Sequence, residues 1–142
     1  MHRYSNQIST TVPDADIKDI LGAISLIESK LSKLVILSEE EKASLPRGKS
    51  NTVMFVQQCL DYAKQYPKYL PKDIDVKEIR KDMQLIQSIS RVMEPLKMVV
   101  KKLEDSALLA GSEAYLPCMA IHNAVKSAQA SRTGTKKDLH TA

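Results

Sequence analysis

Two side chains that could act together in catalysis, Cys118 and His122, stand four residues apart in the last third of the sequence. On a helix this spacing places both on one side, where an imidazole could take the proton of a thiol and make it a nucleophile. No third group that would orient the imidazole is evident, and a hydrogen-bonded core or boundary histidine is the favoured interpretation of His122. We therefore expect no catalytic residues and predict that the protein is not an enzyme.

Metal-binding patterns are missing from the sequence as well. Carboxylate-bridged sites in helical bundles use Glu-x-x-His pairs, because positions i and i+3 share a face. None of the three histidines, His2, His122 and His140, has Asp or Glu three residues before it. Cys59 and Cys118 have no Cys-x-x-Cys partner, which favours reduced thiols in small apolar roles. We expect neither a metal nor a cofactor.

The tripeptide Gly48-Lys49-Ser50 stands at the start of a predicted helix and resembles the end of a phosphate-binding loop. That loop requires a glycine five residues before Gly48, where this chain has Ala43. We therefore reject a nucleotide-binding loop. Arg47 and Lys49 remain candidates for anion binding, since they lie beside the free N–H groups of a helix N-terminus. A solvated turn is the favoured alternative.

Two prolines, Pro95 and Pro117, fall inside predicted helices, where each removes a backbone hydrogen bond at a cost of about 3 kcal/mol. If the chain turns near Asp105, both lie at about the same depth on adjacent antiparallel helices, and two kinks at one level would open a small pocket. Methionines tolerate irregular gaps and varied ligands. Prolines on solvent faces with gentle bends are the favoured alternative. The candidate ligand-binding residues are Met93, Met98, Tyr115, Cys118, Met119 and His122.

The elements that would position these residues are predicted to be helices. The first, from about Asp14 to about Ile36, has apolar residues at steps of three and four along one face. Ser38 and Glu41 form a capping box, which begins a short helix that ends before Pro46. The apolar face of the first helix comprises Ile17, Ile20, Ile24, Ile27, Leu31 and Leu34.

Cap residues also mark the starts of two further helices. Ser50 or Asn51 caps a helix that ends at Tyr66. The following segment, 67–71, has a proline at each end and predicts a stiff extended link. Asp75 caps the longest helix of the chain.

The end of that longest helix is predicted at a turn near Asp105 or Ser106, although Gly111 offers a competing boundary. The last helix then runs to about Ser131, and Gly134 ends it. Short links between long amphipathic segments force neighbouring helices to run antiparallel. The predicted fold is all-α, an up-down-up-down antiparallel four-helix bundle with one extra short helix.

Length and composition are typical of a single small domain of 142 residues. We expect one domain over 1–142, with flexible tails at 1–12 and 133–142. The N-terminus lacks the apolar stretch of a secretory signal, and no run of 18 apolar residues occurs, so we expect a cytoplasmic protein without a membrane partner. The net charge of +4 is concentrated in residues 126–142, which leaves the rest of the chain nearly neutral and makes nucleic-acid binding the weakest hypothesis.

One segment, Ala-Gly-Ser-Glu-Ala-Tyr at 110–115, carries a resemblance together with the capping box, the 52–62 helix, the prolines near residue 70 and Asn-Ala-Val-Lys at 123–126. These features resemble a family of small uncharacterised bacterial all-helical proteins over about residues 25–130. The resemblance implies a bacterial, cytoplasmic helical domain and no known activity. It also implies that Ser112, Glu113 and Tyr115 serve a polar contact between helices or a binding surface. The family's last helix is alanine-rich, whereas Pro117 interrupts it here.

The sequence predicts several amphipathic helices but contains no catalytic or cofactor-binding pattern. Our leading hypothesis is a non-enzymatic protein-interaction or self-associating helical bundle, whose partner is another protein or a second copy of the chain. The alternative is a small-ligand-binding bundle with its pocket at the kinked last two helices.

Overall fold

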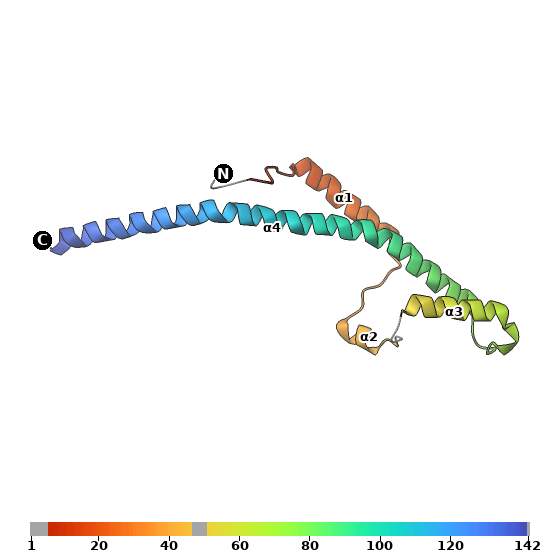
Figure 1. Cartoon of the computed structure of the whole chain (residues 1–142). Helices are drawn as coiled ribbons and strands as arrows, with labels where there is room; N and C mark the ends of the chain where they lie inside the picture. The colour runs from red at the N-terminus through yellow and green to blue at the C-terminus, as the bar shows by residue number, and fades with distance from the viewer. Residues whose placement is uncertain (1–5, 47–50, 142) are drawn as a thin grey trace. The chain divides into compact units, whose positions relative to one another are not determined.

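The structure is a computed structural model that describes residues 6–46 and 51–141, with side chains described as far as residue 132. Within these residues it is all-helical and has no strand, which confirms the predicted fold class. The elements shown in Figure 1 are α1 (Asp14–Lys30), α2 (Glu39–Ser44), α3 (Thr52–Gln65), the 3₁₀ turn η1 (Pro67–Tyr69) and α4 (Val76–Thr141).

The chain divides into two compact units. One, which we call the hairpin unit, is Val12–Leu96 and holds α1, α2, α3, η1 and the first part of α4. The other, which we call the long-helix unit, combines Met1–Thr11 with Lys97–Ala142.

The helix α1 is shorter than predicted. It ends at Lys30, and the Leu31 N–H donates to the carbonyl oxygens of Ile27 and Glu28 at 3.1 and 3.2 Å. The prediction of a helix to Ile36 is therefore wrong. Ser32 and the β-branched Val35 and Ile36 have lower helix propensity than leucine, so the apolar pattern alone does not carry the helix through them.

The predicted cap residues begin α2, α3 and α4 as expected. The Ser38 hydroxyl accepts from the Glu41 N–H at 3.1 Å while the Ser38 N–H donates to the Glu41 carboxylate at 3.4 Å. Asn51 Oδ1 accepts from the N–H of Val53 at 3.1 Å. Asp75 Oδ1 accepts from the N–H of Lys77 at 3.0 Å. Each contact satisfies an N–H group that the helix itself leaves free.

The link between α3 and α4 is not the extended segment that we predicted. Pro67–Tyr69 forms a 3₁₀ turn in which the Tyr69 N–H donates to the Tyr66 carbonyl at 3.1 Å. The rings of Tyr66 and Tyr69 lie edge to face with centroids 6.3 Å apart, an arrangement that aromatic pairs prefer. This edge-to-face contact favours the turn over an extended link.

The two helices predicted after residue 75 are one helix, α4, which has 66 residues. The turn expected near Asp105 is absent, and an ion pair of 2.9 Å between Lys101 and Asp105 crosses that position at the i, i+4 spacing of a continuous helix. Gly111 and Gly134 also lie within α4, so neither ends it. One of the three turns of the predicted bundle is therefore missing from the chain.

The most buried side chain that the structure describes lies on the first part of α4, which belongs to the hairpin unit and is drawn in green in Figure 1. Met83 is 4% exposed, and no other side chain described by the structure is buried to that degree. The half-buried side chains recur at helical spacing on both α3 and α4, as on one face of each helix. They are Val56, Cys59, Leu60 and Ala63 on α3 and Val76 and Ile79 on α4.

Candidate functional site

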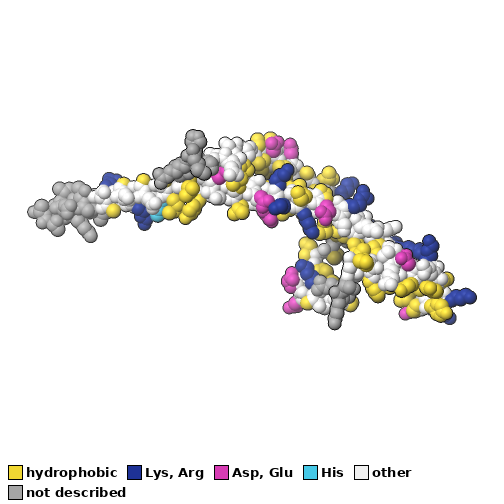
Figure 2. All heavy atoms as spheres, viewed as in Figure 1, with side chains coloured by type: hydrophobic (Ala, Val, Ile, Leu, Met, Phe, Trp, Pro, Cys, Tyr) yellow, Lys and Arg dark blue, Asp and Glu magenta, His cyan; other side chains and the backbone are white. Residues whose placement is uncertain are grey.

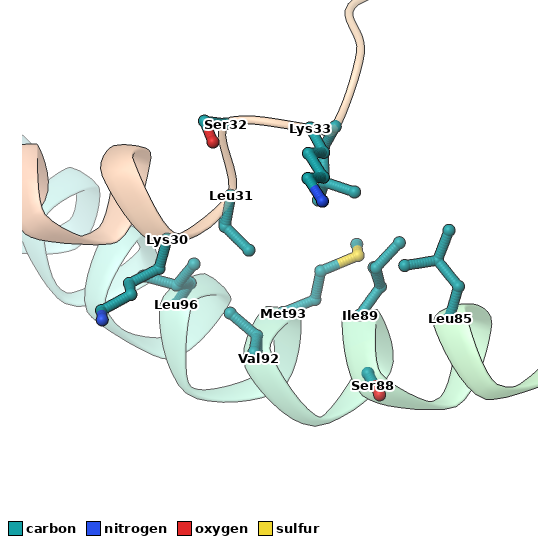
Figure 3. Close-up of a pocket in the computed structure, with 11 residues that line it drawn as sticks. Lys30, Leu31, Ser32, Lys33, Leu85, Ser88, Ile89, Val92, Met93 and Leu96 are labelled. Atoms are coloured by element: carbon teal, nitrogen blue, oxygen red, sulfur yellow. The ribbon is translucent and has the colours of Figure 1, made fainter.

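An apolar pocket of about 530 Å³ lies in the hairpin unit, between the residues that follow α1 and one face of α4 (Figure 3). The chain turns directly after α1, where the Leu34 N–H donates to the Leu31 carbonyl at 3.0 Å. Both leucines line the pocket, and Figure 3 shows the Leu31 side chain directed toward α4. The lining residues are Lys30, Leu31, Ser32, Lys33, Leu34, Leu85, Ser88, Ile89, Val92, Met93 and Leu96.

The charged groups at this pocket have one sign. Two of the lining residues are lysines, Lys30 and Lys33, and none is a carboxylate. Figure 3 shows the Lys33 ammonium turned toward Met93 and Ile89, whereas that of Lys30 points away from the cavity. Neither lysine takes part in the ion pairs formed among residues 6–46 and 51–132. The pocket thus combines an apolar floor with one cationic group directed at it.

The six residues of the predicted pocket are not brought together. They all lie on α4, and the structure assigns Met93 to the hairpin unit and Met98, Tyr115, Cys118, Met119 and His122 to the long-helix unit. Met93 lines the pocket described above, and the other five do not. The prediction depended on a turn that would fold α4 back on itself, and that turn is absent.

Cys118 and His122 share one side of α4, as their spacing predicted, and both are exposed. Among the side chains that the structure describes, no group of three or more His, Cys, Asp or Glu residues could hold a metal ion. The candidate anion-binding residues Arg47 and Lys49 lie outside the described residues.

A stretch of α4 with almost no charge is the most unusual feature of the long-helix unit. Residues 106–125 contain a single charged side chain, Glu113. Large apolar side chains in this stretch are nevertheless well exposed (Figure 2). Leu108 is 75% exposed and Ile121 is 64% exposed. An apolar surface of this length is rarely left facing water in a soluble chain, and it marks an interaction site.

The lone carboxylate of this stretch binds the N-terminal segment of the same unit. Glu113 accepts hydrogen bonds from the backbone N–H of Gln7 and, at 3.4 Å, from that of Ile8. The half-buried residues of α4 nearby lie three to four positions apart on one face, which is the face covered by the segment. They are Ser106, Leu109, Glu113 and Pro117. In this structure the Glu113 carboxylate therefore contacts the N-terminal segment of its own chain.

Replacing Glu113 by alanine should release residues 6–11 from α4, since it removes the acceptor of both backbone N–H groups. We expect the amide hydrogens of Gln7 and Ile8 to exchange at least tenfold faster, because a hydrogen bond to a charged group contributes about 1.5–3 kcal/mol. Hydrogen exchange followed by NMR measures this. The control is Glu104→Ala, an exposed carboxylate on the same helix. Equal exchange rates in Glu113→Ala and the native chain would contradict this contact.

Another apolar row on α4 begins before this stretch and shares only Pro117 with the covered face. Its residues recur at alternating steps of three and four, the spacing that lines the contact between two paired helices. None of its residues is charged. Its large apolar side chains are half exposed or more, with Leu103 at 64% and Val100 at 50%. We call this face the α4 seam, and it comprises Val100, Leu103, Ala107, Ala110, Ala114, Pro117, Ile121 and Ala124.

The apolar pocket after α1 escaped the sequence-based prediction, which assigned Leu31 and Leu34 to a continuing helix. Ser32 and the β-branched pair Val35-Ile36 were the available signals that the helix stops early.

In the side chains that the structure describes, we find no helix that is both long and apolar enough to cross a membrane. No known family model, curated protein or solved structure matches the chain.

Proposed function

We propose that the protein is a non-enzymatic, self-associating helical protein in which α4 pairs with α4 of a second copy along the α4 seam. The observation that carries this proposal is the stretch 106–125, which has one charged residue and exposed apolar side chains on several faces. A helix that is apolar around its circumference is normally buried in a larger assembly. The only carboxylate in the stretch is already engaged by Gln7 and Ile8.

Burial of the seam supplies the driving force for this pairing. Removing apolar surface from water contributes about 25 cal/mol per Å². The alanines of the seam leave little side chain between two helix backbones, so a partner helix can approach closely. The seam has no charged group whose desolvation would oppose the contact.

A second copy is favoured as the partner because the seam is complementary to itself. In an antiparallel pair centred on Ser112, Leu103 lies opposite Ile121, and Ala110 lies opposite Ala114. Leu103 and Ile121 thus meet on both sides of the centre, and small residues meet in the middle. Most homo-oligomers use a two-fold interface of this kind, in which one surface is paired with its own copy.

The predicted up-down bundle then forms between chains instead of within one. Without a turn near Asp105, α4 has no antiparallel neighbour from its own last third. In the proposed pair, α4 of the second copy is that antiparallel neighbour. We extend the proposal to a cytoplasmic location and to the bacterial helical family that the chain resembles. The 110–115 segment of that resemblance lies at the centre of the seam.

Disulfide cross-linking tests both the pairing and its direction. In a Cys59→Ser, Cys118→Ser background, the antiparallel pair places positions 100 and 124 of different copies opposite each other. We expect Val100→Cys combined with Ala124→Cys to give a covalent dimer on mild oxidation, since two thiols must come within disulfide range to react.

The single variants are the matched controls. Val100→Cys alone and Ala124→Cys alone should remain monomeric on a denaturing gel, because each new thiol is then about 36 Å along the helix axis from its own copy. Cross-linking by the single variants instead would indicate a parallel pair. Absence of a covalent dimer in all three variants would contradict self-association through the seam, and a different protein would then be the expected partner.

A further inference from the structure

The pocket between the end of α1 and α4 has a ligand chemistry of its own. We propose that it binds an anionic single-chain amphiphile, whose alkyl chain lies along α4 and whose head group pairs with Lys33. This inference is independent of the proposed pairing of α4, because every lining residue belongs to the hairpin unit and none belongs to the α4 seam.

The floor of the pocket fits an alkyl chain. Its apolar residues on α4 run from Leu85 to Leu96, which is about 16 Å at 1.5 Å per residue, long enough for an extended chain of roughly twelve carbons. The volume, about 530 Å³, falls within the usual range of small-molecule sites. Leu85 is 45% exposed and Val92 is 40% exposed, so a ligand has apolar surface left to cover.

The upper wall of the pocket supplies the selectivity for an anion. The Lys33 ammonium is turned toward the floor and has no ion-pair partner among residues 6–46 and 51–132. Lys30, at the edge, adds a second positive charge, and the lining contains no carboxylate that would repel an anionic head. Ser32 adds a hydroxyl that can donate a hydrogen bond to the head group. A cationic amphiphile could place its alkyl chain on the same floor, but the two lysines would repel its head group.

The experiment is a calorimetric titration of the full chain with dodecanoate below its micelle concentration, repeated with dodecyl phosphate and with dodecyltrimethylammonium. We expect saturable binding of one molecule per chain for both anions. The cationic amphiphile should bind at least tenfold more weakly. The two anionic probes distinguish a carboxylate head from a phosphate head.

Variants at the pocket identify the place of binding. Lys33→Glu should weaken dodecanoate binding at least tenfold by reversing the charge above the floor. Val92→Asp should do the same by placing a carboxylate in it, and circular dichroism checks that this variant keeps its helix content. Lys18→Glu is the matched control, since it makes the same charge change on α1 outside the pocket, and it should stay within twofold of the native chain.

Three results would overturn the proposal. The first is that neither anion binds saturably. The second is that the cationic amphiphile binds as tightly as the anions do. The third is that both Lys33→Glu and Val92→Asp bind dodecanoate as tightly as the native chain. If Val92→Asp alters the mass of the native assembly and leaves dodecanoate binding intact, a second copy of the chain occupies the pocket instead.

Discussion

The double variant Leu103→Asp, Ile121→Asp is expected to be monomeric at concentrations where the native chain is associated. In the antiparallel pair Leu103 of each copy faces Ile121 of the other, so a pair of double-variant chains would bury four carboxylates. Each leucine or isoleucine contributes about 1.5–3 kcal/mol when fully buried, and an unpaired buried charge costs more. We expect the association constant to fall by at least about a thousandfold, which corresponds to about 4 kcal/mol. Sedimentation velocity over a concentration series measures it.

This large effect should not come from unfolding of the chain. Leu103 and Ile121 are each 64% exposed in the single chain, so aspartate at either position stays in contact with water in the monomer. The matched control is Leu108→Asp with Leu116→Asp, which adds the same charge to the same stretch on the face opposite the seam. Leu108 is 75% exposed and Leu116 is 56% exposed. If the control pair dissociates the assembly as strongly as the seam pair does, the seam is not the contact.

The second large effect is expected at Met83. This side chain is 4% exposed within the hairpin unit, and truncation to alanine removes buried apolar atoms and leaves a cavity. We expect Met83→Ala to lower the free energy of unfolding of the hairpin unit by about 2–4 kcal/mol. Native-state hydrogen exchange of the α3 amides reports on this unit without interference from the remainder of α4.

Met98 provides the control for that measurement. It lies on the same helix but is 63% exposed, and exposed substitutions away from special features usually change stability by less than about 0.5 kcal/mol. Equal destabilisation by Met83→Ala and Met98→Ala would mean that Met83 does not lie in the core of the hairpin unit.

The starts of the helices could be predicted from the sequence because they depend on neighbouring residues. The hydroxyl of Ser38, the amide of Asn51 and the carboxylate of Asp75 each bind N–H groups two or three residues ahead. Such contacts need no information about distant parts of the chain.

The prediction of a turn near Asp105 was wrong because no residue in that segment requires the helix to end. Ser106 and the leucines and alanines that follow can continue a helix, and Lys101 pairs with Asp105 across the expected turn. A face of regularly spaced apolar residues predicts that a helix is covered, but it does not say whether the covering helix belongs to the same chain. The turn was predicted on the assumption that each apolar face is buried by a helix of the same chain.

The contents of the candidate sites were predictable only in part. Met93 was identified as a ligand-binding residue and lines a pocket, but its neighbours there come from the turn after α1 rather than from the last third of the chain. Lys33 and Leu34 could not be placed at the pocket from the sequence, because their position depends on where α1 stops. Glu113 was singled out by the resemblance, whereas its bonds to Gln7 and Ile8 span more than a hundred residues.

The most direct test of self-association through α4 is the mass of the native chain in solution. Sedimentation equilibrium over a range from micromolar to about 100 micromolar should show a species of twice the 15.8 kDa chain mass, which the Leu103→Asp, Ile121→Asp variant loses. A mass of 15.8 kDa for the native chain at every concentration would contradict it.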